Sequence, residues 1–262
     1  MPRRKNAPDS STTRSHGPPG GGPSIIAPAL WTSGAGYPLN AEERALLAII
    51  ATVVRFRKGE TIYEAGDHAD AVFNIITGVV KSYRDLPDEK QHIVGFLFPD
   101  DLVGLAESGK YVNSAEAVTA VTLYRIPTRV LEPRLRRNPN LDFQVIAKLC
   151  HELREAQRHA FLLSKQRAVA RMGLFIQMLE TYQAGQEQVT QEVYLPMTRS
   201  DIAAYVGISP EAVSRSFRDL VSRGAITFRD RRHLKIIDRA QLEAVIAEVD
   251  TTTVPRRQRT GD

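Results

Sequence analysis

The segment from residue 195 to residue 238 constrains the fold most, because its capping and turn residues fix two short helices and a hairpin in order. Thr198 can accept a backbone hydrogen bond at the start of a first helix, and Asp201, three residues later, can return one. Gly207 supplies the left-handed backbone that a tight turn between two helices requires. This spacing predicts a helix-turn-helix.

The second helix of this motif is expected to begin at Ser209, whose side chain suits a helix cap. Pro210 then occupies the first turn, where a missing N–H is harmless, and Glu211 complements the helix dipole. A buried stripe is expected from Val213, Phe217 and Leu220. Four polar residues are left to face outward: Glu211, Ser214, Arg215 and Arg218.

These outward residues have the chemistry of base readout. Arg215 can bind the ring nitrogen and carbonyl oxygen of a guanine together, and Glu211 can accept from the amino group of cytosine or adenine. Ser214 is a short, adaptable partner. Residues near the N-terminus of a recognition helix are those that meet base edges.

A basic hairpin follows, with strands expected at residues 225–228 and 234–237. Arg231 and Arg232 at its tip suit phosphates, so it is interpreted as a wing, and the predicted DNA contacts also include Arg199 and Ser209. Seven basic residues against three acidic ones give residues 211–235 a local charge of +4, which suits a polyanion. The alternative is a pair of helices whose charges are merely solvated.

Upstream of this motif, short β-rich runs with glycines at or near their turns predict a barrel, roll or sandwich. The expected strand residues are Phe56, 61–63, 72–76, 79–83, 93–98 and 115–126, and the glycines are Gly59, Gly66, Gly78, Gly95, Gly104 and Gly109. A helix at residues 40–53 is expected to precede them. The fold class is therefore α+β, with a β domain spanning residues 39–138.

A long helix is predicted at residues 139–164, with apolar positions spaced alternately three and four apart. This heptad seam consists of Ile146, Leu149, Leu153, Ala156, Ala160 and Leu163. We interpret it as the contact of a parallel homodimer; the alternative is packing against the β domain. A further helix at about 166–182 opens a DNA-binding domain that spans residues 165–250.

Composition indicates which parts of the chain are disordered and in which compartment the protein resides. Residues 1–38 hold seven of the fifteen prolines and six of the seventeen glycines, so a disordered arm is expected there, with a flexible tail at 251–262. No apolar run reaches the roughly 20 residues of a membrane span, and no signal peptide is recognisable. A cytoplasmic protein without membrane contact is predicted.

Three elements in this order resemble the Crp/Fnr superfamily of bacterial transcription regulators over residues 39–248: a β-roll, a long dimer helix and a winged helix-turn-helix. The run ISPEAVSRSFRDLVSRGAI is similar to that family's recognition helix, and DDLVGLAESGKYVNSAEAVTAVTLYRIP to its effector domain. Glu211, Ser214 and Arg215 match the Glu-x-x-Ser-Arg pattern of the Fnr and FixK branch. The resemblance implies a dimer on double-stranded DNA at TTGA-N6-TCAA-like sites, activation and contact with RNA polymerase.

Departures from the family pattern indicate which ligands or cofactors are not expected to control this protein. Cyclic-nucleotide binders of this family use Gly-Glu and Arg-Ser pairs, where this chain has Gly104-Leu105 and Asn113-Ser114. Control by cyclic AMP is therefore not expected. The iron–sulfur sensors of the family use several cysteines, and Cys150 is the one cysteine here, so no cluster and no other cofactor is predicted.

Weaker signals remain. His151, Glu155 and His159 have metal-ligand spacing on one helix face, but a solvated flank of the heptad seam is favoured and no metal site is predicted. Cys150 is interpreted as inert packing rather than a redox switch. Haem ligation by His68 or His92 stays open.

Two classes of function are considered. The first is a DNA-binding regulator without catalytic residues. The second is a ligand-sensing or enzymatic β domain whose helix-turn-helix contacts protein. The outward Arg215 and the arginines of the wing favour the first.

Overall fold

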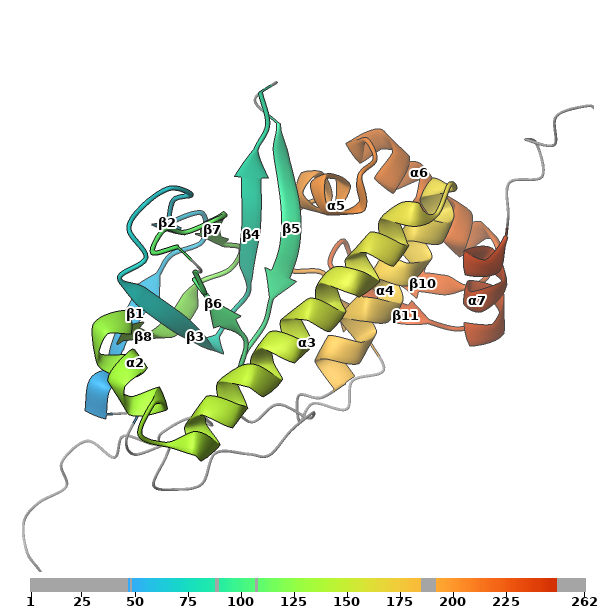
Figure 1. The fold of residues 1–262 in the computed structure, drawn as a ribbon. Coiled ribbons are helices and arrows are strands. Elements are labelled where there is room, and N and C mark those ends of the chain that lie inside the picture. The colour runs from blue at the N-terminus through green and yellow to red at the C-terminus, as the bar shows by residue number, and fades with distance from the viewer. Residues whose placement is uncertain (1–46, 48, 88–89, 107, 185–191, 249–262) are drawn as a thin grey trace, which may run out of the picture.

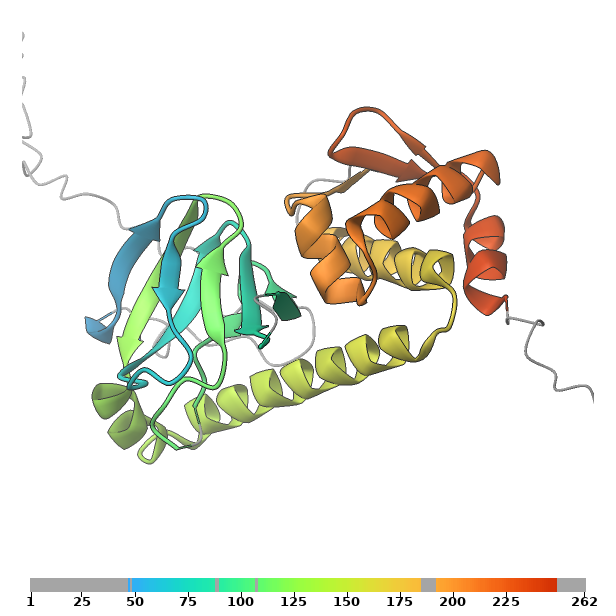
Figure 2. The same cartoon turned by 90° about the horizontal axis from the view of Figure 1, so that it is seen from above.

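A computed structural model describes residues 47, 49–87, 90–106, 108–184 and 192–248. A β-roll and a helical domain lie at opposite ends of a long helix, α3 (Pro139–Ser164), and the helical domain folds back toward the roll (Figures 1 and 2). The predicted arm at 1–38 and tail at 251–262 lie outside the described residues. Among those residues, no helix combines the length and the apolarity needed to cross a bilayer.

The β-roll consists of two four-stranded antiparallel sheets, in the orders β1-β8-β3-β6 and β2-β7-β4-β5. Its strands are β1 (Thr52–Phe56), β2 (Thr61–Tyr63), β3 (Ala71–Thr77), β4 (Val80–Asp85), β5 (Gln91–Leu97), β6 (Leu102–Val103), β7 (Ser114–Ala117) and β8 (Val121–Pro127). Side chains from both sheets meet in a core that includes Ile75, Val80, Ala115 and Leu123, all fully buried. The predicted α+β class is confirmed.

Glycine has a specific role at the turn between β3 and β4. Gly78 has a φ of 91°, and a Cβ there would lie 2.4 Å from the carbonyl oxygen of Ala120. That close approach holds the β3–β4 turn against the β7–β8 turn, which divides the run predicted at 115–126 into two strands. Gly95, by contrast, was wrongly associated with a turn: it lies within β5 beside a register shift opposite Ser82.

The prediction for residues 40–53 is wrong at its end. Residues 40–46 and 48 lie outside the described part, and Leu47, Ile49 and Ile50 are helical. Strand β1 begins at Thr52, because this β-branched stretch pairs with β8. A helix that was not predicted, α2 (Thr128–Leu135), connects β8 toward α3.

Helix α3 has the bounds expected from the sequence. Asn138 caps it by accepting the Leu141 N–H at 3.1 Å, and Pro139 occupies its first position. The next helix, α4 (Ala168–Ala184), begins and ends two residues later than predicted.

The C-terminal domain packs three further helices and a three-stranded sheet, in the order β10-β11-β9, against α4. Its elements are β9 (Glu192–Tyr194), α5 (Arg199–Val206), α6 (Pro210–Ser222), β10 (Ile226–Phe228), β11 (His233–Ile236) and α7 (Arg239–Ala247). Strand β9 and helix α7 were not predicted. The fully buried Met172, Phe175 and Ile176 of α4 form the centre of its core.

A buried charge cluster joins the two ends of the molecule. Lys81 on β4 has its Nζ 3.1 Å from Glu116 on β7 and 3.2 Å from Asp201 on α5. Burial lowers the pKa of Lys81, but the two carboxylates outweigh that effect and the net pKa is raised. The ring of Phe96 on β5 also lies 5.2 Å from that of Tyr205 on α5. The helix-turn-helix is therefore docked on the β4–β5 side of the roll.

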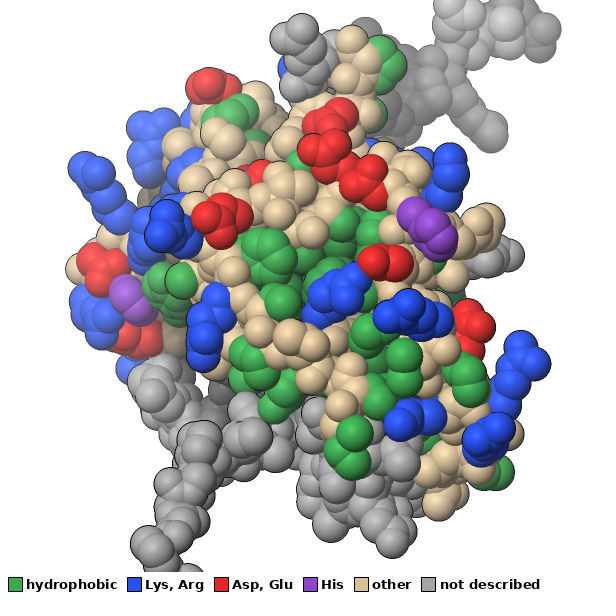
Figure 3. Space-filling model, turned by 90° about the vertical axis from the view of Figure 1, so that its left-hand side faces the viewer, with side chains coloured by type: hydrophobic (Ala, Val, Ile, Leu, Met, Phe, Trp, Pro, Cys, Tyr) green, Lys and Arg blue, Asp and Glu red, His purple; other side chains and the backbone are tan. Residues whose placement is uncertain are grey.

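Basic side chains are not confined to the C-terminal domain. Seen from the end that carries the β-roll, Lys and Arg side chains are spread around the face and hydrophobic ones gather near its middle (Figure 3). Net charge alone therefore does not locate a nucleic-acid interface on this molecule, and local geometry has to do so.

Candidate nucleic-acid interface

The first helix of the motif begins and ends as predicted. The Asp201 N–H donates to Thr198 Oγ1 at 3.0 Å, and the Thr198 N–H donates to Asp201 Oδ2 at 2.9 Å. This reciprocal pair is the predicted capping box. Gly207 ends the helix with a φ of 70°, so the left-handed turn is also confirmed.

The second helix, α6, shows the predicted cap and inner face. Ser209 accepts the Ala212 N–H at 3.2 Å, and Pro210 occupies the first helical position. Its inner face is buried: Val213, Phe217 and Leu220. The outer residues Glu211, Ser214, Arg215 and Arg218 are all exposed.

The charge state of Glu211 fits hydrogen-bond acceptance. A hydrogen bond from the Ser209 hydroxyl, the backbone at the helix start and the nearby Arg215 lower the pKa of the Glu211 carboxyl. An ionised carboxylate only accepts hydrogen bonds, which suits a base amino group. Ser214 donates to the Pro210 carbonyl at 3.1 Å, so its oxygen retains acceptor capacity.

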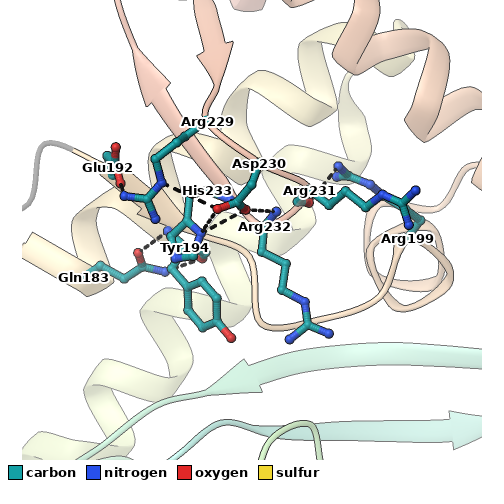
Figure 4. A network of polar contacts seen from close by, with 9 residues as sticks. All are labelled: Gln183, Glu192, Tyr194, Arg199, Arg229, Asp230, Arg231, Arg232 and His233. Atoms are coloured by element: carbon teal, nitrogen blue, oxygen red, sulfur yellow. Dashed lines mark hydrogen bonds and ion pairs between the residues drawn. The ribbon is translucent and has the colours of Figure 1, made fainter.

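The wing is shaped by an acidic residue at its turn (Figure 4). The Asp230 carboxylate accepts the backbone N–H groups of Arg232 at 2.7 Å and His233 at 3.0 Å, and lies 2.8 Å from His233 Nδ1. The bond from the Arg232 backbone is the largest of the causes that lower the pKa of Asp230 to about 2. Arg229 is turned toward Glu192, whereas Arg231 and Arg232 are exposed at the tip.

Arg199 has the most distinctive setting of the predicted contacts. Its guanidinium lies 4.0 Å from the ring centre of Phe217 and 5.5 Å from that of Phe228. Nη2 donates to the Arg231 carbonyl at 3.4 Å, which ties α5 to the wing, while Nη1 is buried and has no hydrogen-bond partner among the described residues. A buried donor without a partner is costly, so this setting of Arg199 is not explained by packing alone.

The heptad seam is mostly open to solvent in the single chain. Ile146, Leu149 and Leu153 are 48%, 45% and 61% exposed, and Ala156 and Ala160 are exposed too. Leu163 differs, because it is half-buried against the core of the C-terminal domain. The alternative of packing on the chain's own β-roll therefore does not account for the five N-terminal positions.

Two interpretations made on α3 are wrong. His159 is not solvated: it is buried and stacked on Tyr205 with ring centres 4.0 Å apart, and its Nε2 donates to the Tyr205 carbonyl at 2.8 Å. Burial lowers the pKa of this imidazole. Cys150, expected to be packed, is exposed. Sequence spacing could not show that the helical domain folds over this face of α3.

The histidines do not assemble a metal site among the described residues. His68 is exposed and forms a single β-bridge with Lys110, whereas His92 is half-buried on β5 with its ring 6.2 Å from that of His159. The cluster of Lys81 with Glu116 and Asp201 was not predicted from the sequence, where only a helix-capping role was expected for Asp201. Its members are 35 to 120 residues apart, and no pattern in the sequence connects them.

The residues that replace the cyclic-nucleotide contacts line one cavity. Leu105 and Asn113 both face it, whereas the hydroxyl of the buried Ser114 accepts the Ala65 N–H at 3.0 Å. Arg84 donates to Asn113 at 2.8 Å, but its own side chain is exposed and is not part of the lining.

Known proteins share both ends of this architecture. Residues 53–138 match a family model described as a cyclic nucleotide-binding domain, and residues 170–245 match a Crp-like helix-turn-helix domain. The nitrogen fixation regulation protein FixK of Bradyrhizobium diazoefficiens is 31% identical over 219 residues, which cover 84% of this chain and 92% of that protein.

Two further relatives agree with this match. The fumarate and nitrate reduction regulatory protein of Salmonella typhi is 33% identical over 182 residues, which cover 68% of this chain and 73% of that protein. Among solved structures, that of FixK2 from Bradyrhizobium japonicum aligns with a TM-score of 0.70 at 30% identity, covering 77% of this chain and 100% of that one.

Proposed function

The chain belongs to the Crp/Fnr family of transcription regulators, and from this premise we propose that it binds an inverted repeat of the form TTGA-N6-TCAA as a homodimer. The observation that carries the proposal is the outward face of α6, where Glu211, Ser214 and Arg215 are exposed together near the helix start. Residues at this end of a recognition helix reach base edges in the major groove.

Phosphate contacts would hold this helix in place. Arg199, with its buried and unpartnered Nη1, lies between the recognition helix and the wing. Arg231 and Arg232 extend the basic surface at the wing tip, and Ser209 and Arg218 flank the base-reading residues. Such contacts fix the register of a protein on the duplex, while base contacts select the sequence.

Dimerisation follows from the exposed apolar side chains of the heptad seam. Exposed leucines and isoleucines in a continuous helical stripe are stabilised when a second helix covers them. In a parallel pair, two recognition helices related by the dimer axis would enter successive major grooves about 34 Å apart. This geometry supports an inverted repeat as the target.

Activation through contact with RNA polymerase is proposed from the relatives. Proteins that match this chain include the transcriptional activatory protein AadR of Rhodopseudomonas palustris and the transcriptional activator protein anr of Pseudomonas aeruginosa. A cytoplasmic site of action follows from the same proposal, because its target is chromosomal DNA.

Selection of bound sequences from a random duplex pool tests the proposal. We expect enrichment of an inverted repeat whose half-sites contain TTGA. Recovery of no DNA motif would overturn it and would favour a helix-turn-helix that contacts protein. Recovery of an unpaired half-site would leave DNA binding intact and contradict the dimer.

A further inference from the structure

A cavity of about 450 Å³ lies between the β-roll, α3 and the C-terminal domain. The roll contributes β5, β6 and the loop at 111–113, and α3 contributes the side that carries Glu152 and Leu153. Tyr182 of α4 and Tyr205 of α5 complete the wall. This volume falls within the range of small-molecule sites, and an occupant would touch both domains at once.

The cavity wall carries negative charge only. Asp101, Glu152 and Glu155 line it, and among the described residues no lysine or arginine does. These carboxylates come from a turn of the roll and from two neighbouring positions on α3. An anionic ligand such as a cyclic nucleotide would meet repulsion here, which agrees with the absence of a phosphate-binding arginine at Asn113.

Two of the carboxylates are incompletely satisfied. The side chain of Asp101 is only 10% exposed; its Oδ2 accepts the Phe98 N–H at 2.8 Å, but its Oδ1 is 4.0 Å from His151 Nε2, too far for a hydrogen bond. Oε2 of Glu155 is buried without a hydrogen-bond partner among the described residues. Burial is the chief cause that raises the pKa of the Tyr182 hydroxyl, and the neighbouring Glu155 side chain adds to it.

Neighbouring cations do not neutralise the group. Lys148 faces Asp101 and Glu152 from outside the lining, and its Nζ donates to the carbonyl of Asp100 at 2.8 Å. Arg158 donates to Oε1 of Glu155 at 2.6 Å and leaves Oε2 unsatisfied. Burial lowers the pKa of His151, so this imidazole is neutral at pH 7 and above.

Burial and mutual repulsion show their effect on the acids themselves. Burial raises the pKa of Asp101 to about 6 and that of Glu152 to about 7. The negative charges of Asp101 and Glu155 raise the pKa of Glu152 further, whereas Lys148 lowers the pKa of both acids. At pH 8 the cavity therefore holds three carboxylates, and among the described residues the cations beside them are Lys148 and Arg158. A cation bound there would add a further counter-charge.

Aromatic rings provide the rest of the wall. Tyr63 and Tyr111 are stacked with ring centres 3.8 Å apart, and both line the cavity. Tyrosine faces attract cations and pack well against apolar groups. A wall that combines carboxylates with tyrosine side chains is complementary to an ammonium or guanidinium group on an apolar body.

We propose that this cavity binds a small organic cation, whose amine or guanidinium pairs with Glu152 and Glu155 while its apolar body packs against the tyrosines. The cavity also reaches the heptad seam, because Leu153 and Ala156 belong to both. In the proposed dimer the partner helix would close this side. A bound cation would therefore contact the roll, the dimer helix and the helix-turn-helix domain at the same time.

Calorimetric titration of the full chain at pH 8 tests the proposal, with phenethylamine and agmatine as cationic probes. The matched neutral control is 2-phenylethanol, which has the shape of phenethylamine without its charge. We expect one amine per chain, bound at least tenfold more tightly than the alcohol. Equal affinity for amine and alcohol, or no binding of either cation at 10 mM, would overturn the proposal.

Variants locate the site. Glu152→Gln and Glu155→Gln should each weaken amine binding at least tenfold, and Asp142→Asn, an exposed change on the same helix, should leave it unaltered. Affinity should also fall as the pH is lowered from 8 to 6, because Asp101 and Glu152 take up protons. Unaltered binding in both glutamine variants would place the amine elsewhere and refute the site. These titrations contain no DNA, so their failure leaves the proposed regulator function standing.

Discussion

The helix-turn-helix and the interdomain cavity differ in how their key residues are distributed along the chain. In the motif, Thr198, Asp201, Gly207 and Ser209 each act on a neighbour within five residues. In the cavity, Asp101 and Glu152 are 51 positions apart and meet only because α3 runs past the roll. The first region is encoded locally, whereas the second is created by packing.

The largest effect is expected at the heptad seam, on which both regions depend. The double change Leu153→Glu and Ala160→Glu would bury unpaired charges at the helix contact, which costs at least several kcal/mol. We expect monomers by light scattering and a loss of at least 100-fold in affinity for the selected DNA site. Arg154→Glu, exposed on the same helix but outside the seam, is the matched control. A double variant that keeps its dimeric mass would contradict the assignment of the seam.

The next effect is at the recognition helix. Arg215→Ala removes a bidentate guanine contact of roughly 1–3 kcal/mol per half-site, so about 2–6 kcal/mol is expected for the dimer. On a site whose guanine has been replaced, the Arg215→Ala variant and the parent protein should bind with nearly equal affinity. Gel-shift titrations with the selected site, the altered site and unrelated DNA distinguish these cases.

Arg231→Ala is the comparison for this variant, because Arg231 is exposed at the wing tip. It should weaken binding to all sequences alike and make the dependence of log affinity on log salt shallower by about one unit per contact. If Arg215→Ala also weakens selected and unrelated DNA equally, Arg215 is an electrostatic contact and the recognition assignment fails.

Local encoding explains what the sequence could predict. The caps at Thr198 and Ser209, the turn at Gly207 and the outward face of α6 follow from residue types within one or two helical turns. The bounds of α3 were predicted for the same reason, since Asn138 and Pro139 mark its start.

Long-range packing explains what the sequence could not predict. His159 has a polar neighbourhood in sequence, yet α5 covers it and Tyr205 accepts its hydrogen bond. Strand β9 is three residues long and exists because β11 lies beside it. Lys81 likewise finds Asp201 only after the two domains dock.

A pH-dependent effect of intermediate size is expected from the cavity. Burial raises the pKa of Glu152 from 4.5 in an unfolded chain to about 7. Between these values the folded protein holds a proton that the unfolded chain has lost, so stability falls as the pH rises. Full ionisation would cost up to about 3 kcal/mol, at about 1.36 kcal/mol per pKa unit.

Glu152→Gln should remove this cost. Urea unfolding should show a variant that is more stable than the parent at pH 8, by up to about 3 kcal/mol, and nearly equal to it at about pH 4, below the unfolded pKa. Asp142→Asn should follow the parent at both values. A Glu152→Gln variant that is less stable than the parent at pH 8 would mean that the carboxylate is satisfied within the fold, and that the cavity needs no cation.

The smallest effect is expected from two glycine substitutions, which test whether Gly207 is required by its local turn or by tertiary packing. Gly207 and Gly224 share the left-handed conformation, with φ of 70° and 73°. A Cβ at Gly207 would lie 3.2 Å from Leu163 Cδ2 and 3.3 Å from Arg171 Nη1, both ends of flexible side chains, whereas a Cβ at Gly224 meets nothing within 4 Å. Backbone strain should therefore dominate, and each Gly→Ala change should cost about 1 kcal/mol in unfolding free energy.

The two costs, measured by urea unfolding at pH 7, should agree within about 0.5 kcal/mol. A cost at Gly207 that exceeds that at Gly224 by about 2 kcal/mol would show that packing against α3 and α4, and not the turn alone, requires glycine there, so that even this motif is not encoded by its nearest neighbours.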